Sequence, residues 1–177
     1  MTETEFLNLV HQGAGRGSFE EGWESGGAWE IHAQVVIAAF LRSGYGITDA
    51  RELAYPGSQE HCDFGFTHKG RKYAVELKVE NKKDGKFGGM SLDQAMLTDV
   101  NKLHAFNADE LWFLVIARSD NAKQRLLELA MRGDSWIVDQ EAGFLAALCN
   151  IRTQPHGLPW QRYEKQALKL EQSPFYQ

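Results

Sequence analysis

The sequence predicts an α/β sandwich in which a mixed β-sheet packs against helices. Three observations indicate this fold class: apolar residues recur at helical spacing in 28–43, residues 62–80 alternate between apolar and polar, and 111–117 is nearly continuously apolar. The composition agrees, with 43% hydrophobic and 24% charged residues, as is usual for globular proteins. At 177 residues, the chain is expected to form a single domain spanning 1–177.

The first part of the chain is expected to be a glycine-rich segment followed by a helix. Glycines cluster in GAGRGSFEEGWESGG, residues 13–27, which predicts a flexible, exposed segment. From 28 to 43, apolar side chains at roughly helical spacing predict one buried face. These side chains are Ile31, Val35, Ile37 or Ala38, and Leu41. The next stretch, GYGITDARELAYPG (44–57), is expected to contain a short strand before Pro56.

Residues 62–80 are predicted to form a hairpin of two strands around a turn at Lys69-Gly70. If Lys69 and Gly70 form a two-residue turn, His68 faces Arg71, and this fixes the pairing of all the residues behind them. A three-residue turn would shift the pairing by one residue and move every side chain of one strand to the other face.

The second half of the chain predicts further helices and strands. Ser91 is the expected N-cap of a helix over 92–106. Its apolar face comprises Leu92, Ala95, Met96, Val100 and Leu103. Residues 111–117 are expected to form a central strand covered on both faces. The remaining expected elements are a helix over 121–132, a strand over 135–139, and helices over 141–150 and 160–172.

The two-residue turn places two carboxylates together, because Asp63 then lies opposite Glu76. Lys78 emerges on the same face, whereas the alternate residues point into the core. Like charges directly opposed across strands are destabilising, and a hard divalent cation such as Mg²⁺ would remove that repulsion. The alternative is a solvated strand, on which Glu76, Lys78 and Glu80 form the wet face.

Asp63 followed by Glu76-Leu77-Lys78 resembles the motif of the PD-(D/E)xK nuclease superfamily. The resemblance covers a core of about residues 28–118, including the helix and strand after the motif. Cys62 stands where many members have a proline. The resemblance implies the restriction-endonuclease-like fold, a three-layer α/β/α sandwich with a central mixed β-sheet.

The resemblance also implies a metal site for Mg²⁺, with Mn²⁺ as a substitute. Asp63, Glu76 and the backbone carbonyl of Leu77 would hold one or two ions. Lys78 would orient or deprotonate the attacking water, or stabilise the transition state. These four residue roles come from the motif positions.

A further acid is expected from the first helix, since family members often contribute a glutamate there. Glu30 is the matching residue for a catalytic and metal-binding role, and Glu24 is the second choice. Gln34 lies one turn after Glu30. A glutamate early in a helix also favours the helix dipole, so Glu30 has a structural interpretation too. Asp99 and Lys102 are expected to form an exposed ion pair, from which Lys102 could contact a phosphate.

The implied function is Mg²⁺-dependent endonuclease activity on phosphodiester bonds, with DNA favoured as the substrate. The expected nucleic-acid contacts are basic residues: Lys69, Arg71, Lys72, Lys82, Lys83, Lys86 and Lys102. A net charge of −5 weighs against tight non-specific nucleic-acid binding and favours an alternative, a non-catalytic binding or immunity-type protein on the same fold. Cutting both strands would need two sites, which suggests a homodimer or a partner protein.

The sequence predicts a cytoplasmic protein that does not enter a membrane. Cys62 and Cys149 are the only cysteines, which fits a reduced compartment better than a disulfide scaffold. The N-terminus lacks a basic start followed by an apolar run. The longest apolar run, 33–41, is far shorter than the roughly 20 residues of a membrane span.

Overall fold

The computed structural model describes residues 1–26, 29–55, 57, 59–131 and 136–153. Its centre is a five-stranded mixed sheet in the order β3-β4-β5-β7-β6. The strands are β3 (Phe64–His68), β4 (Arg71–Val79), β5 (Glu110–Ala117), β6 (Trp136–Glu141) and β7 (Phe144–Asn150). β4 and β5 are parallel and the other neighbours are antiparallel. The predicted α/β class with a mixed sheet is confirmed.

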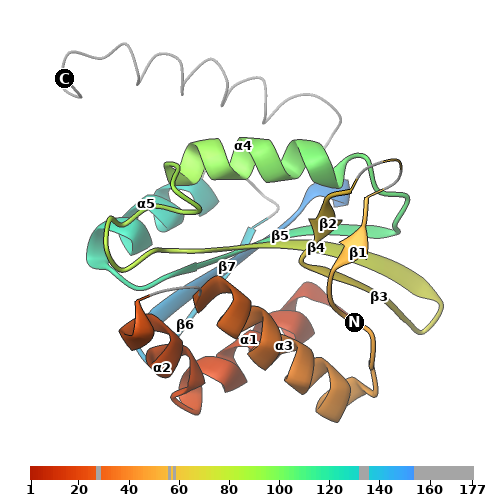
Figure 1. The fold of residues 1–177 in the computed structure, drawn as a ribbon, viewed down its shortest axis with the longest axis horizontal. Coiled ribbons are helices and arrows are strands. Elements are labelled where there is room, and N and C mark those ends of the chain that lie inside the picture. The colour runs from red at the N-terminus through yellow and green to blue at the C-terminus, as the bar shows by residue number, and fades with distance from the viewer. Residues whose placement is uncertain (27–28, 56, 58, 132–135, 154–177) are drawn as a thin grey trace.

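Helices cover both faces of this sheet (Figure 1). Three helices lie on one face, namely α1 (Glu3–Gly15), α2 (Ser18–Ser25) and α3 (Trp29–Tyr45), and two lie on the other, α4 (Leu92–Leu103) and α5 (Asp120–Ala130). A small two-stranded sheet, β1 (Leu53–Ala54) with β2 (His61–Cys62), precedes β3, and a 3₁₀ turn, η1 (Ile151–Thr153), follows β7. None of the helices in the described ranges is both long and apolar enough to cross a membrane.

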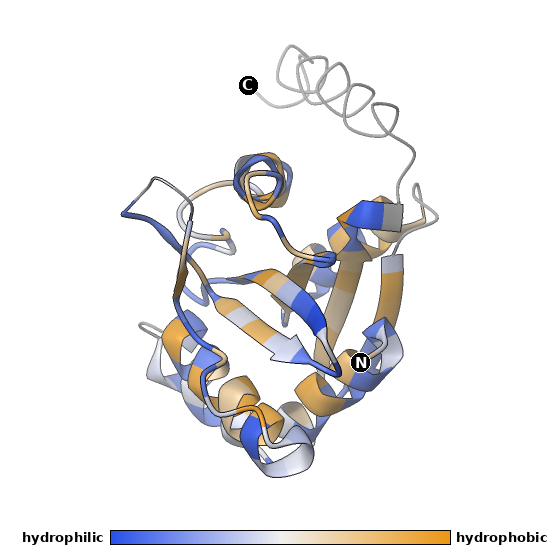
Figure 2. Ribbon diagram, turned by 90° about the vertical axis from the view of Figure 1, so that its right-hand side faces the viewer, coloured by the Kyte–Doolittle hydropathy of each residue, from blue (hydrophilic) through white to orange (hydrophobic). Residues whose placement is uncertain are grey.

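The alternating side chains of the strands build a separate hydrophobic core on each face. Val75, Leu77 and Val79 of β4 join the core under α1, α2 and α3, as the hairpin pattern predicts. Ala74 of β4 and Phe113 of β5 join the core under α4 and α5. Figure 2 shows hydrophobic residues along the strands that lie between the two helical layers. Because helices cover both faces of the sheet, most of β4 is buried, and only its first two residues, Arg71 and Lys72, are exposed.

The expectation of a flexible, exposed segment over 13–27 is wrong for residues 13–25. These residues end α1 and form α2, and the Phe19 side chain is fully buried. The glycines permit close helix packing there: a Cβ on Gly22 would lie 2.7 Å from the His32 ring. Residue 27 lies outside the described part of the chain.

Helix α3 is confirmed, but its predicted buried face is partly wrong. Ile31 and Val35 are 55% and 49% exposed. The buried residues are Trp29, Ala33, Gln34, Ile37 and Leu41. The helix therefore packs through a stripe at four-residue spacing that begins at Trp29. Ile37 and Leu41 belong to it as predicted, whereas Trp29 and Ala33, two positions earlier, take the places expected for Ile31 and Val35.

The helix expected over 141–150 is wrong, because this segment forms β7. Phe144–Asn150 contains good helix formers, yet it pairs with β5 on one side and β6 on the other. Ala142 and Gly143 have φ of 47° and 82° and form the tight turn that folds β7 back along β6. Tertiary pairing overrides helix propensity here. The helix expected over 160–172 lies outside the described residues.

The other expected elements are confirmed in the described ranges. Strand β1 lies within the segment expected to contain a short strand, and β6 matches the late strand. Ser91 caps α4 and forms a reciprocal capping box with Gln94. Strand β5 is buried along its whole length, and α5 follows it after an N-cap at Ser119.

Candidate active site

The β3–β4 hairpin has the register expected from a two-residue turn. Phe64 pairs with Val75, so one further step places Asp63 opposite Glu76. The turn residues Lys69-Gly70 have φ of 49° and 77°, the positive values that the commonest two-residue hairpin turns require. The hairpin therefore brings the two motif acids to neighbouring positions.

β4 has an open edge where the site lies. β3 pairs with β4 only as far as Val75. Beyond it, the Leu77 N–H donates to Asp63 Oδ2 at 2.6 Å, and the Leu77 carbonyl accepts a hydrogen bond from Lys78 Nζ at 3.1 Å. Side chains thus make the hydrogen bonds that a neighbouring strand would otherwise make with the Leu77 backbone. This arrangement concentrates polar groups at this edge.

Asp63 and Glu76 sit in different surroundings. Asp63 Oδ1 accepts a hydrogen bond from Gln34 Nε2 at 2.5 Å. Glu76 is only 4% exposed, and the Tyr55 hydroxyl donates to its Oε1. Burial, and then the neighbouring Asp63 carboxylate, raise the pKa of Glu76 to about 9. At neutral pH, Glu76 therefore holds a proton unless a cation takes its place.

Lys78 connects the sheet to both helical layers. Its Nζ lies 3.4 Å from Glu30 Oε1 of α3 and 3.2 Å from Asp99 Oδ2 of α4. Burial disfavours the ammonium, but Glu30, Asp99 and Asp63 outweigh it and raise the pKa of Lys78. The lysine is therefore a fixed positive charge at neutral pH.

Glu30 belongs to the site because its carboxylate pairs with the Lys78 ammonium. Burial raises the pKa of Glu30, while the ammonium of Lys78 opposes that rise. The second choice, Glu24, lies elsewhere and pairs with Lys82 at 2.7 Å. The structure therefore selects Glu30 as the helix acid beside the motif.

Asp99 was expected in an exposed ion pair, and this is wrong. Asp99 is 3% exposed and its carboxylate points to Lys78, while Lys102 Nζ lies 3.8 Å from Asp99 Oδ1. The helical spacing contained the signal, because Asp99 lies three and four residues from Met96 and Leu103, on the buried stripe of α4.

Tyr55 is a site residue that the sequence did not reveal. Its ring lies 4.5 Å from that of Phe106, and its hydroxyl reaches Glu76. Tyr55 follows β1 in a stretch that folds back beside β4, and its own backbone N–H pairs with the Glu60 carbonyl. No local pattern marks such a contact, which depends on the tertiary path of the chain.

The solvated-strand alternative is wrong, because α4 packs over this face of β4 and Glu76 is only 4% exposed. Glu80, expected to be wet, is 1% exposed and accepts hydrogen bonds at 2.8 Å from the backbone N–H groups of Arg118 and Ser119. Trp29 Nε1 donates to the Glu80 carbonyl at 2.6 Å. Glu80 thus fixes the start of α5, a structural role distinct from that of Glu76.

The predicted nucleic-acid contacts divide between the two ends of β4. The turn-end group is Lys69, Arg71 and Lys72, and the site-end group is Lys82, Lys83, Lys86 and Lys102. Lys72 lies six residues before Lys78 along β4, a distance of about 20 Å in an extended strand. Arg71 is also engaged by Glu110 at 2.5 Å. Only the site-end group follows β4 or adjoins Asp99.

The donor set suits a cation that keeps most of its water. Within the described residues, no group of three or more His, Cys, Asp or Glu side chains could hold a metal ion. Asp63 and Glu76 supply two carboxylates, and Leu77 supplies a carbonyl. Mg²⁺ is commonly bound by one or two carboxylates and several waters, so this smaller set fits it. A cation bound here would replace the proton of Glu76 and balance the negative charge of its carboxylate.

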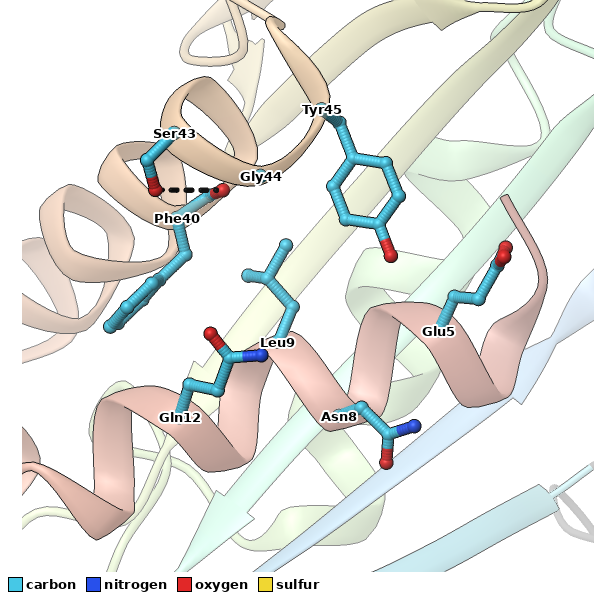
Figure 3. A pocket seen from close by; sticks show the side chains of 8 residues that line it. All are labelled: Glu5, Asn8, Leu9, Gln12, Phe40, Ser43, Gly44 and Tyr45. Carbon is cyan, nitrogen blue, oxygen red and sulfur yellow. Dashed lines mark hydrogen bonds between the residues drawn. The ribbon is translucent and has the colours of Figure 1, made fainter.

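A pocket of about 260 Å³ lies elsewhere, between α1 and α3 (Figure 3). Its lining residues are Glu5, Asn8, Leu9, Gln12, Phe40, Ser43, Gly44 and Tyr45. None of them is a predicted site residue. The candidate site is therefore a strand edge, separate from this pocket.

No family model, curated protein or solved structure matches the chain. The function therefore rests on the chemistry of the site and on the motif resemblance. The pair of carboxylates beside a buried ammonium is the feature that any functional interpretation has to explain.

Proposed function

We propose that the protein is a metal-dependent nuclease that hydrolyses phosphodiester bonds, with DNA as the favoured substrate. The observation that carries the proposal is the gathering of Asp63, Glu76 and Lys78 at the open edge of β4, with Glu30 beside them. Two adjacent carboxyl groups suit a divalent cation, and an adjacent ammonium suits a phosphate.

The chain's own residues have distinct roles in this proposal. Mg²⁺, when bound, would lower the pKa of a water molecule and offset charge on the phosphate. Asp63, Glu76 and the Leu77 carbonyl would hold it. Lys78 carries its positive charge at neutral pH, so it would orient the phosphate and stabilise negative charge in the transition state instead of accepting a proton.

The restriction-endonuclease-like fold belongs to the same proposal. It is supported by a helix before the hairpin, the motif on β4, and α4 leading into the parallel strand β5. DNA is favoured through the motif resemblance. Cleavage of both strands would require a second site, supplied by another copy of the chain or by a partner protein.

The test is cleavage of supercoiled plasmid and single-stranded DNA with Mg²⁺ or Mn²⁺. Wild type should cleave and Lys78→Ala should not. Lys123→Ala, on α5 and paired with Asp120, is the matched control and should cleave like wild type. Equal cleavage by Lys78→Ala would contradict the proposed site. No cleavage by any of them would favour a non-catalytic binding protein, which the acidic net charge of −5 also favours.

A further inference from the structure

Asp99 is a buried carboxylate that the motif does not include. It is 3% exposed on α4, and its Oδ2 lies 3.2 Å from Lys78 Nζ as an ion pair. That oxygen has no other hydrogen-bond partner among the described residues. Burying a carboxylate with so few partners is costly unless a charge compensates it. Lys78 is the closer compensating charge, since Lys102 lies 3.8 Å from the other oxygen.

Lys78 is shared between two carboxylates from opposite sides of the sheet. Glu30 approaches it from α3 at 3.4 Å, and Asp99 approaches it from α4. Glu30 is also the helix acid expected to help hold a cation beside Asp63. One carboxylate cannot neutralise the ammonium fully and serve a cation as well. If Glu30 turns toward a cation, Asp99 is the carboxylate left to hold Lys78.

We propose that Asp99 is a positioning residue of this site: it anchors the Lys78 ammonium from α4 and so leaves Glu30 free to turn from the lysine toward a cation. This inference rests on the proposed function. Helix α4 suits an anchor, because its capping box fixes its start and its apolar face is buried against the sheet.

Kinetics provide the first test. In Mn²⁺-dependent plasmid cleavage, Asp99→Asn should lower kcat by about 10- to 100-fold with little change in KM, because the lysine loses its position and not its charge. Asp99→Glu should restore part of kcat. Asp93→Asn is the matched control: it makes the same change on α4, removes an ion pair with Arg125 at 2.8 Å, and should leave kcat unchanged. An unchanged kcat in Asp99→Asn would overturn the inference.

Stability provides a second test that needs no catalysis. Double-mutant cycles would combine Lys78→Met with Asp99→Asn or with Glu30→Gln, and unfolding would be measured without metal and with saturating Mn²⁺. Without metal, both cycles should show coupling to Lys78. With Mn²⁺, the Glu30 coupling should fall to within error and the Asp99 coupling should persist. A Glu30 coupling that Mn²⁺ leaves unchanged, or no effect of Mn²⁺ on unfolding, would overturn the inference.

The two tests separate failure of the inference from failure of the proposed function. A wild-type protein that cleaves no nucleic acid would remove the nuclease proposal, yet the Mn²⁺ cycles would still report whether Asp99 replaces Glu30 at Lys78. Conversely, cleavage that depends on Lys78 but not on Asp99 would retain the nuclease and remove the positioning role.

Discussion

At the scale of single residues, the site gathers four carboxyl groups near one buried ammonium: Glu30 and Asp99 pair with Lys78, and Asp63 lies beside Glu76. One ammonium cannot neutralise four carboxylates, so the excess is handled by protonation and hydrogen bonding. The excess negative charge is what would attract a cation. The same charges hold the lysine in its ionised form, so cation binding and lysine position are physically linked.

The protonated carboxylate predicts a specific pH dependence of stability. The pKa of Glu76 is raised from 4.5 to about 9, so between these values the folded protein binds more protons than the unfolded chain. Stability from this group is full below pH 4.5 and is lost as the pH rises toward 9. The slope from one such proton is at most about 1.4 kcal/mol per pH unit.

Glu76→Gln should remove that slope, because glutamine keeps an acceptor for Tyr55 but does not titrate. Urea unfolding of both proteins at several pH values measures the difference. Glu110→Gln is the control, since Glu110 is also buried but lies at the other end of β4 beside Arg71. If wild type and Glu76→Gln lost stability in parallel, Glu76 would not carry the proton.

Tyr55→Phe tests the hydroxyl that supports Glu76. Phenylalanine keeps the ring against Phe106 but removes the hydrogen bond to Glu76. The unfolding free energy should fall by about 1–2 kcal/mol at neutral pH. Tyr45→Phe is the control, because its hydroxyl has no hydrogen-bond partner among the described residues. Equal effects of the two substitutions in denaturant unfolding would show that the Tyr55 hydroxyl contributes nothing specific.

At the scale of elements, the hairpin turn decides whether the site exists. A one-residue change in the turn would move Asp63 to the opposite face from Glu76. Local sequence was sufficient to predict this turn, the register, the cap of α4 and the buried strand β5, because each depends on nearby residues. It was insufficient for β7, whose helix-forming residues are held extended by β5 and β6 on either side.

The candidate site divides in the same way. Asp63, Glu76 and Lys78 were accessible from the hairpin pattern. The sequence predicts the correct helix for Asp99, but the expectation of an exposed ion pair with Lys102 is wrong, because Asp99 is buried. Tyr55 was not accessible, because its contact with Glu76 exists only after the chain folds back beside β4.

The turn can be strengthened without touching the site. Lys69 has φ of 49°, a conformation that asparagine tolerates better than lysine and that β-branched residues resist. Lys69→Asn should raise the unfolding free energy by about 0.5 kcal/mol, and Lys69→Val should lower it by about 1 kcal/mol. Chemical denaturation measures both. The reverse order would contradict the assigned turn and the register that depends on it.

At the scale of the whole molecule, the acidic net charge of −5 coexists with basic residues at both ends of β4. In the site-end group, Lys102 lies beside Asp99 and the other three lysines follow the end of β4, whereas the turn-end group lies about 20 Å away from Lys78 along the strand. A nucleic acid whose phosphate sits at Lys78 would therefore contact the site-end group. The turn-end lysines should contribute little.

Matched double variants test this division. Lys83→Gln with Lys86→Gln should weaken binding of labelled single-stranded DNA and reduce the salt dependence of log K by about one for each phosphate that the protein no longer neutralises. Lys69→Gln with Lys72→Gln removes the same charge and should leave both quantities near wild type. Fluorescence anisotropy across a salt series, without divalent metal so that the DNA is not cleaved, gives both values. Equal weakening would place the nucleic acid elsewhere.

The measurement that tests the central claim most directly is Mn²⁺ binding by isothermal titration calorimetry. Wild type and Glu110→Gln should bind the ion, and both Asp63→Asn and Glu76→Gln should lose that binding. This outcome would place the metal on the carboxylate pair at the open edge of β4. Absence of binding in wild type, or equal binding by all four proteins, would contradict the metal site and the nuclease proposed from it.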